Sequence, residues 1–247
     1  IVEIYDISKF KKTDRPKSIK YIPSRKEVDI YDDYIIENNN NFIVINKPAG
    51  IAVQSGTKSF KNIIDVLKDS KYFTDCKPFI VHRLDKETSG ILIIAKNREY
   101  AQLFTSLFRI RKIHKTYIAI THGKISNTIK TMQENLILYE NKRKIVQKAI
   151  SHIKILQTSS DYTFVELNPI TGRKHQLRKQ LYNIGNPIVG DEKYFINRKI
   201  IRNKSKNKKL MLHAYKIKFM INNVKFNFKA KYSDEFENFL KNKVKNF

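Results

Sequence analysis

The sequence is poor in cysteine and has no tryptophan: Cys76 is the single cysteine in 247 residues. One cysteine excludes an internal disulfide framework and a cysteine-rich zinc site. It fits a reducing compartment, and we expect a cytoplasmic protein. The chain also lacks any uninterrupted apolar run that approaches the roughly 20 residues of a transmembrane helix. We therefore expect no membrane partner.

Acidic residues are also scarce, because 23 Asp and Glu stand against 49 Lys and Arg, for a net charge of +26. This excess predicts a polyanionic partner, since neutralising phosphates and releasing their counterions drives binding. An AT-biased genome also enriches lysine, asparagine and isoleucine, so the placement of the charges is more informative than their number. The densest block, residues 198–209, has seven cations and no acid. Such a block is typical of a solvated loop and of a polyanion contact.

Several catalytic signatures are missing. With one cysteine the chain cannot form the zinc site of a nucleobase deaminase. It has no Walker phosphate loop, no G-x-S-x-G elbow and no glycine-rich kinase loop. What remains is a carboxylate that acts with basic residues and a tyrosine on an anionic polymer. Because a carboxylate can attack an anomeric carbon and an arginine can keep it ionised, the residues predict carboxylate chemistry on a nucleotide sugar.

The most polar short stretch lies between two apolar runs. Residues 81–90, VHRLDKETSG, follow Phe79-Ile80 and precede the apolar run 91–95. A surface turn does not need a histidine, two basic groups, two carboxylates and two hydroxyls together. Since loops held by rigid strands often carry binding and catalytic groups, this stretch is a candidate site as well as a plain charged hairpin connection.

Apolar periodicity predicts an α+β fold, built on a mixed, mostly antiparallel sheet with flanking helices. Strands are expected at 42–45, 79–81, 91–95, 114–120, 149–155, 163–167, 210–219 and 224–228. Helices are expected after a cap at Ser59, across 100–108, within 171–184, and after a cap at Ser233. Residues 1–32 are predicted to be an extension or linker, and residues 33–247 a single domain.

The segment HRLDKETSG, residues 82–90, resembles the signature of the RluA-type pseudouridine synthases, in which H-R-L-D-x-x-T-S-G holds a catalytic aspartate. Five further blocks resemble segments of that family: NKPAG (46–50), KTYIAI (115–120), TGRKHQLR (171–178), GNPIVGDEKY (185–194) and LHA (212–214). The resemblance covers roughly residues 33–230. It implies a pseudouridine synthase catalytic domain of the RluC or RluD kind, which acts on large-subunit ribosomal RNA.

The resemblance also implies roles for single residues. Asp85 matches the catalytic aspartate, Tyr117 the active-site tyrosine that stacks on the uracil, and Arg178 the arginine that pairs with the aspartate. Arg83 is expected to help flip the base out of the RNA. The residues expected to bind substrate, or to build the pocket, are Arg83, His82, Lys47, Arg173 and His175. No metal and no nucleotide cofactor is expected, the partner is RNA rather than DNA, and we expect a monomer.

The sequence departs from the family pattern at three positions and leaves the substrate open. Lys174, Asn186 and Phe195 stand where threonine, histidine and glycine are common in the family. Glu87 falls at a variable position of the signature and is given no role. The opening residues IVEIYD resemble the last strand of an S4 RNA-binding domain, so a longer protein is expected. Two alternatives stay open, which are the same chemistry on transfer RNA and a non-catalytic RNA-binding module.

Overall fold

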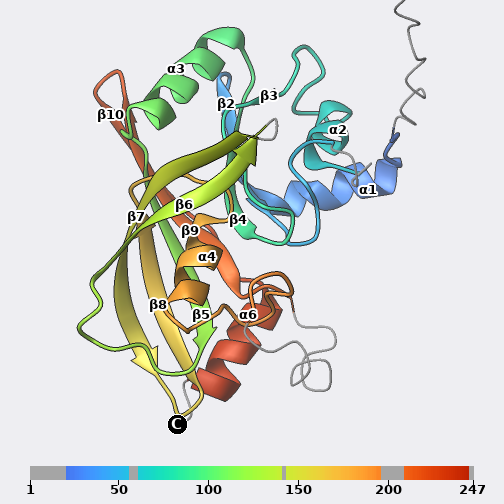
Figure 1. Cartoon of the computed structure of the whole chain (residues 1–247). Helices are drawn as coiled ribbons and strands as arrows, with labels where there is room; N and C mark the ends of the chain where they lie inside the picture. The colour runs from blue at the N-terminus through green and yellow to red at the C-terminus, as the bar shows by residue number, and fades with distance from the viewer. Residues whose placement is uncertain (1–20, 56–60, 141–142, 196–208, 245–247) are drawn as a thin grey trace, which may run out of the picture.

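The computed structural model describes residues 21–55, 61–140, 143–195 and 209–244 (Figure 1). Residues 1–20 of the predicted extension and residues 198–208 of the cationic block lie outside the described part of the chain, as does the predicted cap Ser59. Among the described residues, no helix combines the length and the apolar character that a membrane crossing requires.

The described strands form one ten-stranded sheet in the order β1-β2-β4-β9-β5-β8-β7-β6, with β3 paired to β4 and β10 paired to β9. All of these pairings are antiparallel except that of β4 with β9. The predicted α+β fold with a mostly antiparallel sheet is therefore confirmed. The strands are β1 (Ile35–Asn38), β2 (Phe42–Lys47), β3 (Phe79–Ile80), β4 (Ser89–Ala95), β5 (His114–His122), β6 (Thr131–Glu140), β7 (Arg143–Thr158), β8 (Tyr162–Pro169), β9 (Leu212–Ile221) and β10 (Val224–Lys229).

β2 and β4 are buried on both faces, which is why their sequences are nearly continuous apolar runs. One face, which includes Ile43 and Leu92, packs against α2 (Ile63–Lys68). The other face, which includes Phe42, packs against Phe104 of α3 (Arg98–Arg109). Helices on both sides thus fix this half of the sheet (Figure 1).

The other half of the sheet, β5 to β8, packs on α4 (Gln176–Asn183) and α6 (Asp234–Phe239). Leu177 and Leu181 of α4 are buried in this core, as predicted, and so are Phe236 and Leu240 at the C-terminal end. β6 and β7 form a long twisted ribbon that passes beside α4 (Figure 1). α4 is therefore held between this ribbon and the centre of the sheet.

β9 joins the two halves. It pairs with β5 along most of its length, but it meets β4 at two residue pairs, Ser89 with His213 and Gly90 with Ala214. The Oγ of Ser89 and the Nδ1 of His213 are hydrogen-bonded at 2.9 Å. Gly90 has φ +106°, and a Cβ there would lie 2.3 Å from the backbone oxygen of Ala214. The closing glycine of the polar stretch therefore allows the contact that connects the two halves.

The structure refines three local predictions. α2 begins at Ile63, where the side chain of Asn62 accepts a hydrogen bond from the Asp65 amide, so Asn62 is the cap of the described helix. α4 begins at Gln176, because His175 is left-handed (φ 55°) and residues 171–175 form a turn. The expected linker contains helix α1 (Arg25–Ile30), whose Ser24-x-x-Glu27 capping box was present in the sequence but overlooked.

Candidate active site

A hollow of about 960 Å³ opens where the two halves of the sheet meet. Asp85, from the connection between β3 and β4, lines it on one side. Tyr117 of β5 and Arg178 of α4 line it from the other half. These are the three residues predicted to be catalytic, and they come together from segments up to 93 positions apart.

The turn that carries Asp85 is fixed by backbone bonds. The Thr88 amide donates to the Asp85 carbonyl at 3.1 Å, and the Gly50 amide donates to the Lys86 carbonyl at 2.9 Å. Gly50 has φ +88°, a conformation that glycine adopts without strain. The NKPAG segment therefore supports the turn of Asp85 from behind.

Lys47 completes this support from the interior. Its side chain has no exposed surface, and its ammonium donates to the carbonyls of Pro48, Ile51 and Lys86 at 2.8, 3.0 and 3.2 Å. Burial lowers the pKa of Lys47 to about 7, and the negative charges of Glu87 and Asp85 oppose that shift. An ammonium with its three donors used inside the protein cannot reach an RNA phosphate. Of the two roles expected for Lys47, binding substrate or building the pocket, its burial fits the second, as a support for the turn of Asp85.

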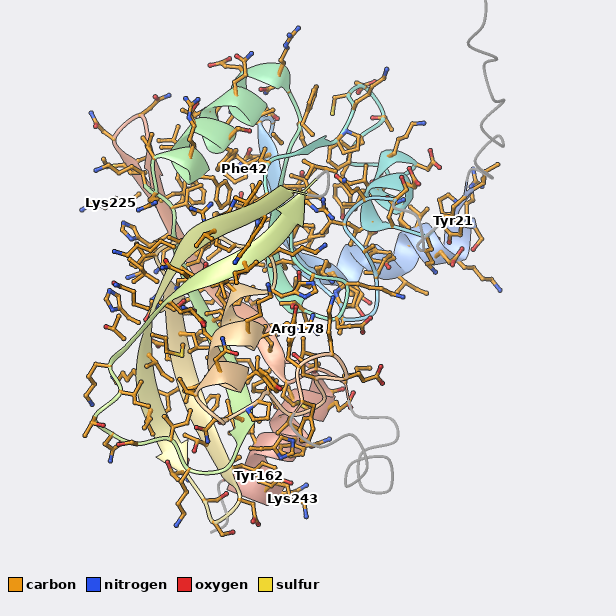
Figure 2. The ribbon with its side chains drawn as sticks, in the orientation of Figure 1. Tyr21, Phe42, Tyr162, Arg178, Lys225 and Lys243 are labelled. Atoms are coloured by element: carbon orange, nitrogen blue, oxygen red, sulfur yellow. The ribbon has the colours of Figure 1, made fainter. Side chains whose placement is uncertain are left out.

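Arg178 is held mainly by a carboxylate that the sequence analysis did not single out. Its Nε and Nη2 donate to the two oxygens of Asp191 at 2.7 and 2.8 Å. Its Nη1 is left to face Asp85, at 3.4 Å from Oδ2. Burial opposes the charged form, yet the bonds to Asp191 and the charge of Asp85 raise the pKa of Arg178. Arg178 belongs to α4 and lies near the middle of the molecule (Figure 2).

Asp191 is itself fully satisfied. Its side chain is completely buried, and its Oδ1 also accepts the backbone amides of Lys193 and Tyr194 at 2.9 and 3.0 Å. Tyr194 in turn packs its ring under the guanidinium of Arg178, 5.3 Å from ring centre to Cζ. The GDEKY segment therefore builds a fixed seat for Arg178. This segment lies in one of the blocks that resemble the family, but nothing in the sequence indicated a role for Asp191.

His175 approaches Asp85 from the start of α4. Its Nε2 lies 3.6 Å from Oδ1 of Asp85, and its Nδ1 is 2.9 Å from the hydroxyl of Tyr194. Burial lowers the pKa of His175, with Asp85 acting against that shift and Arg178 in its favour. Since burial also raises the pKa of Tyr194, its hydroxyl stays protonated and can donate to Nδ1. His175 therefore lies between Tyr194 and Asp85, with one ring nitrogen toward each.

Tyr117 lies at a shift of register between β5 and β9. Its ring packs against the cores of both halves of the sheet. Burial and the charge of Asp85 raise the pKa of Tyr117, so the hydroxyl stays protonated in the neutral range. The pocket thus contains an aromatic ring with a protonated hydroxyl close to a carboxylate.

The other predicted binding residues divide into fixed and exposed side chains. His82 accepts the Ile93 amide at Nε2 (2.9 Å) and stacks on Phe108, and burial lowers its pKa to about 3. It is therefore a neutral wall of the pocket. Arg173 donates from Nε to the Lys148 carbonyl at 3.3 Å. Arg83 lines the pocket with an exposed side chain.

Two buried glutamines set the position of α4. Gln176 donates to the Ile150 carbonyl at 3.0 Å and to Ser151 Oγ at 2.9 Å. Gln180 donates to the carbonyl of Met132 at 3.1 Å and accepts from Ser151 Oγ at 2.7 Å. These bonds connect one side of α4 to β6 and β7, while the pocket lies next to Arg178. In the part of the chain that is described, no three His, Cys, Asp or Glu side chains lie close enough to hold a metal ion.

Three kinds of comparison relate the chain to known proteins. A family model described as RNA pseudouridylate synthase matches residues 41–183, which is more than half of the chain. Among solved structures, human RNA pseudouridylate synthase domain containing 4 superposes with a TM-score of 0.72 at 25% identity, covering 87% of this chain and 94% of that one.

Curated relatives carry the name ribosomal large subunit pseudouridine synthase C. The protein of Buchnera aphidicola subsp. Baizongia pistaciae is 34% identical over 77% of this chain and 63% of its own length. The protein of Rickettsia felis is 38% identical over 76% of this chain and 63% of its own length. The matched region is thus somewhat less than two thirds of these relatives. The family match and these identities show that the chain belongs to the RNA pseudouridylate synthase family, of the RluA type.

Proposed function

We propose that this chain is an RNA isomerase that converts specific uridines to pseudouridine, with large-subunit ribosomal RNA as its substrate. One observation carries the proposal: Asp85, Tyr117 and Arg178 line a single pocket of about 960 Å³. The net charge of +26 supports an RNA partner. The ribosomal assignment is supported by the name of the relatives, which are large-subunit enzymes.

The proposed reaction exchanges one glycosidic bond for another. The Asp85 carboxylate either adds to C1′ of the uridine or removes a ribose proton to give a glycal, and in both routes the N1–C1′ bond breaks. The freed uracil turns in the pocket and bonds to C1′ through C5. This step breaks the bond from Asp85 to C1′ in the first route, and in the second route Asp85 returns the proton to the ribose. C5 then loses its proton, while N1 gains one, so that the RNA is isomerised without a redox step.

The pocket residues fit the needs of that exchange. Arg178 pairs with Asp85 and orients it through the contact of 3.4 Å between Nη1 and Oδ2. The Tyr117 ring would provide a face for uracil stacking, and its protonated hydroxyl lies in the same pocket as Asp85. A uridine inside a helix must first be flipped out, at a cost of roughly a few kcal/mol, and exposed Arg83 at the rim is suited to assist.

The test is direct conversion of RNA by the purified protein. Transcripts of large-subunit ribosomal RNA and of transfer RNA, each tritiated at C5 of uracil, are incubated with the chain. Release of tritium to water, together with pseudouridine in the digested RNA, is expected from the ribosomal transcript. Pseudouridine mapping in RNA from cells that lack the protein should show the same uridine unmodified. If neither transcript is converted and no cellular site loses its modification, the proposal fails.

We predict that Asp191 is a positioning residue for this reaction. Asp191→Asn leaves a buried guanidinium without its charge partner, which should lower the stability by about 3 kcal/mol. Since Arg178 then loses the seat that aims Nη1 at Asp85, kcat should fall more than tenfold, with a much smaller change in KM. Denaturant unfolding and steady-state kinetics on the converted transcript measure the two effects.

The control for Asp191 is its neighbour. Glu192 is exposed, and among the described residues it forms no ion pair, so Glu192→Gln makes the same charge change outside the network. That variant should match the wild type in both stability and kcat. Equal kcat in Asp191→Asn and wild type, at a temperature where both are folded, would rule out the positioning role.

A further inference from the structure

A second, smaller cavity of about 330 Å³ lies next to the candidate active site. Its wall is formed by the end of α3, the start of β5 and the loop that follows β8. The two cavities share lining residues, among them Phe108, Lys115 and Arg173. A ligand chain that fills the larger cavity can therefore continue directly into the smaller one.

The charged side chains around the smaller cavity are all of one sign. Arg109, Arg111, Lys115 and Arg173 line it, and no acidic residue of the described chain does. None of these four forms an ion pair with a described carboxylate. Burial and the positive charge of Arg111 lower the pKa of Lys115. The charged form of Lys115 is therefore less favourable as long as no anion lies beside it. Like charges held around one cavity are expected where an anionic group binds.

The backbone at Arg111 is a second, independent observation. Arg111 follows α3 with φ +61°, and its amide donates to the Phe108 carbonyl at 3.2 Å. Glycine is the residue that usually occupies this left-handed position after a helix, because a side chain there is strained. The chain instead places a guanidinium at the cavity. Non-glycine residues in strained conformations are concentrated at functional sites.

Gly172 lines the cavity beside Lys115. A Cβ added at Gly172 would be in ordinary contact with the ammonium of Lys115, at 3.8 Å, so the backbone of residue 172 lies next to this cation. Arg173, the next residue, is anchored through its Nε to the Lys148 carbonyl. The cavity therefore has one partly buried ammonium, one anchored guanidinium and two exposed arginines on its rim.

We propose that this cavity binds a backbone phosphate of the substrate RNA, at a nucleotide next to the uridine that enters the active site. The inference rests on the proposed function, which makes the polymer RNA. It adds a specific anchor, because a phosphate fixed here sets the distance along the strand to the pocket of Asp85. Arginine and lysine side chains together suit a phosphodiester, which offers several acceptor oxygens.

The test combines Arg111→Gly with single neutral linkages in the RNA. Glycine removes the guanidinium and relieves the backbone, so the melting temperature should not fall. The probe is a stem–loop of large-subunit ribosomal RNA that the wild type binds. The dissociation constant of this RNA should rise by about 5- to 10-fold in the variant. The slope of the logarithm of the binding constant against the logarithm of the salt concentration should become shallower, by the amount that corresponds to about one phosphate contact. Lys112→Ala, an equal charge change that lines neither cavity, should leave binding and conversion unchanged.

Neutral linkages then locate the phosphate. Methylphosphonates are placed one at a time around the target uridine, each compared with a 2′-O-methyl phosphodiester at the same nucleotide. At one position the neutral linkage should weaken wild-type binding but not that of Arg111→Gly. Absence of such a position, or equal affinity of Arg111→Gly and wild type, overturns the phosphate site even if uridine is converted. If one neutral linkage weakens binding by the wild type but not by Arg111→Gly, and the RNA is still not converted, the result supports the phosphate site and counts against the proposed reaction.

Discussion

Asp85→Asn is expected to slow the conversion of a bound uridine by at least about 1000-fold, because an amide can neither add to C1′ nor remove a ribose proton. The variant should still bind RNA, since it removes a negative charge from a pocket that receives a polyanion. Single-turnover kinetics with saturating protein separate the two effects. The rate should fall, while the dissociation constant should stay the same or decrease.

The structure also predicts that Asp85→Asn folds normally. Arg178 keeps its two short bonds to Asp191, and only the 3.4 Å contact from Nη1 is weakened. Glu87→Gln is the matched control, because Glu87 is exposed in the same turn and carries the same charge. It should convert uridine at the wild-type rate. Retention of a tenth or more of the wild-type rate by a folded Asp85→Asn would mean that the carboxylate is not the reacting group.

Gly90→Ala is expected to have the largest effect on stability. A Cβ at this position would lie 2.3, 2.6 and 2.7 Å from three backbone atoms of Ala214, and backbone cannot rotate away as a side chain can. The φ of +106° adds strain for any residue with a side chain. We expect a loss of at least about 4 kcal/mol in the free energy of unfolding. Chemical denaturation followed by circular dichroism measures it.

Gly185→Ala separates conformational strain from collision. Gly185 follows α4 with φ +84°, but a Cβ there would have no atom within 4 Å. It should therefore lower the stability by only about 1 kcal/mol. If both variants lost the same amount of stability, the close approach of β4 to β9 would not be the reason for glycine at position 90.

The periodicity of apolar residues and the positions of capping residues were sufficient to predict most of the fold. β2, β4 and α3 were predicted from apolar runs and from spacing of three and four residues, and all three are present with nearly the predicted bounds. The start of α4 could not be predicted, because it depends on contacts outside the helix. The side chain of Gln176 accepts the hydroxyl of Thr171 and the amide of Arg173, which holds the preceding residues in a turn.

The candidate site was predicted in part, for physical reasons. Asp85, Tyr117 and Arg178 were expected from the resemblance to the RluA-type family, and the structure brings all three together in one pocket. The role of Asp191 depends on a bidentate approach across 13 residues of chain, and local patterns do not encode that geometry. The burial of Lys47 has no signal in the sequence, because lysine is rarely buried and the carbonyls that accept its ammonium are brought together only by the fold.

The place of β9 in the sheet has a consequence for the order of assembly during synthesis. β9 lies between β4 and β5 in the strand order, yet it follows every residue assigned to the site in the sequence. Contacts such as Ser89 with His213 close a loop of 124 residues, and such long-range pairings form late in folding. A growing chain that already contains Asp85, Tyr117 and Arg178 would therefore lack the strand that joins their two halves. Activity should thus emerge only once residues 212–221 are available, so a nascent chain would be unable to modify RNA prematurely.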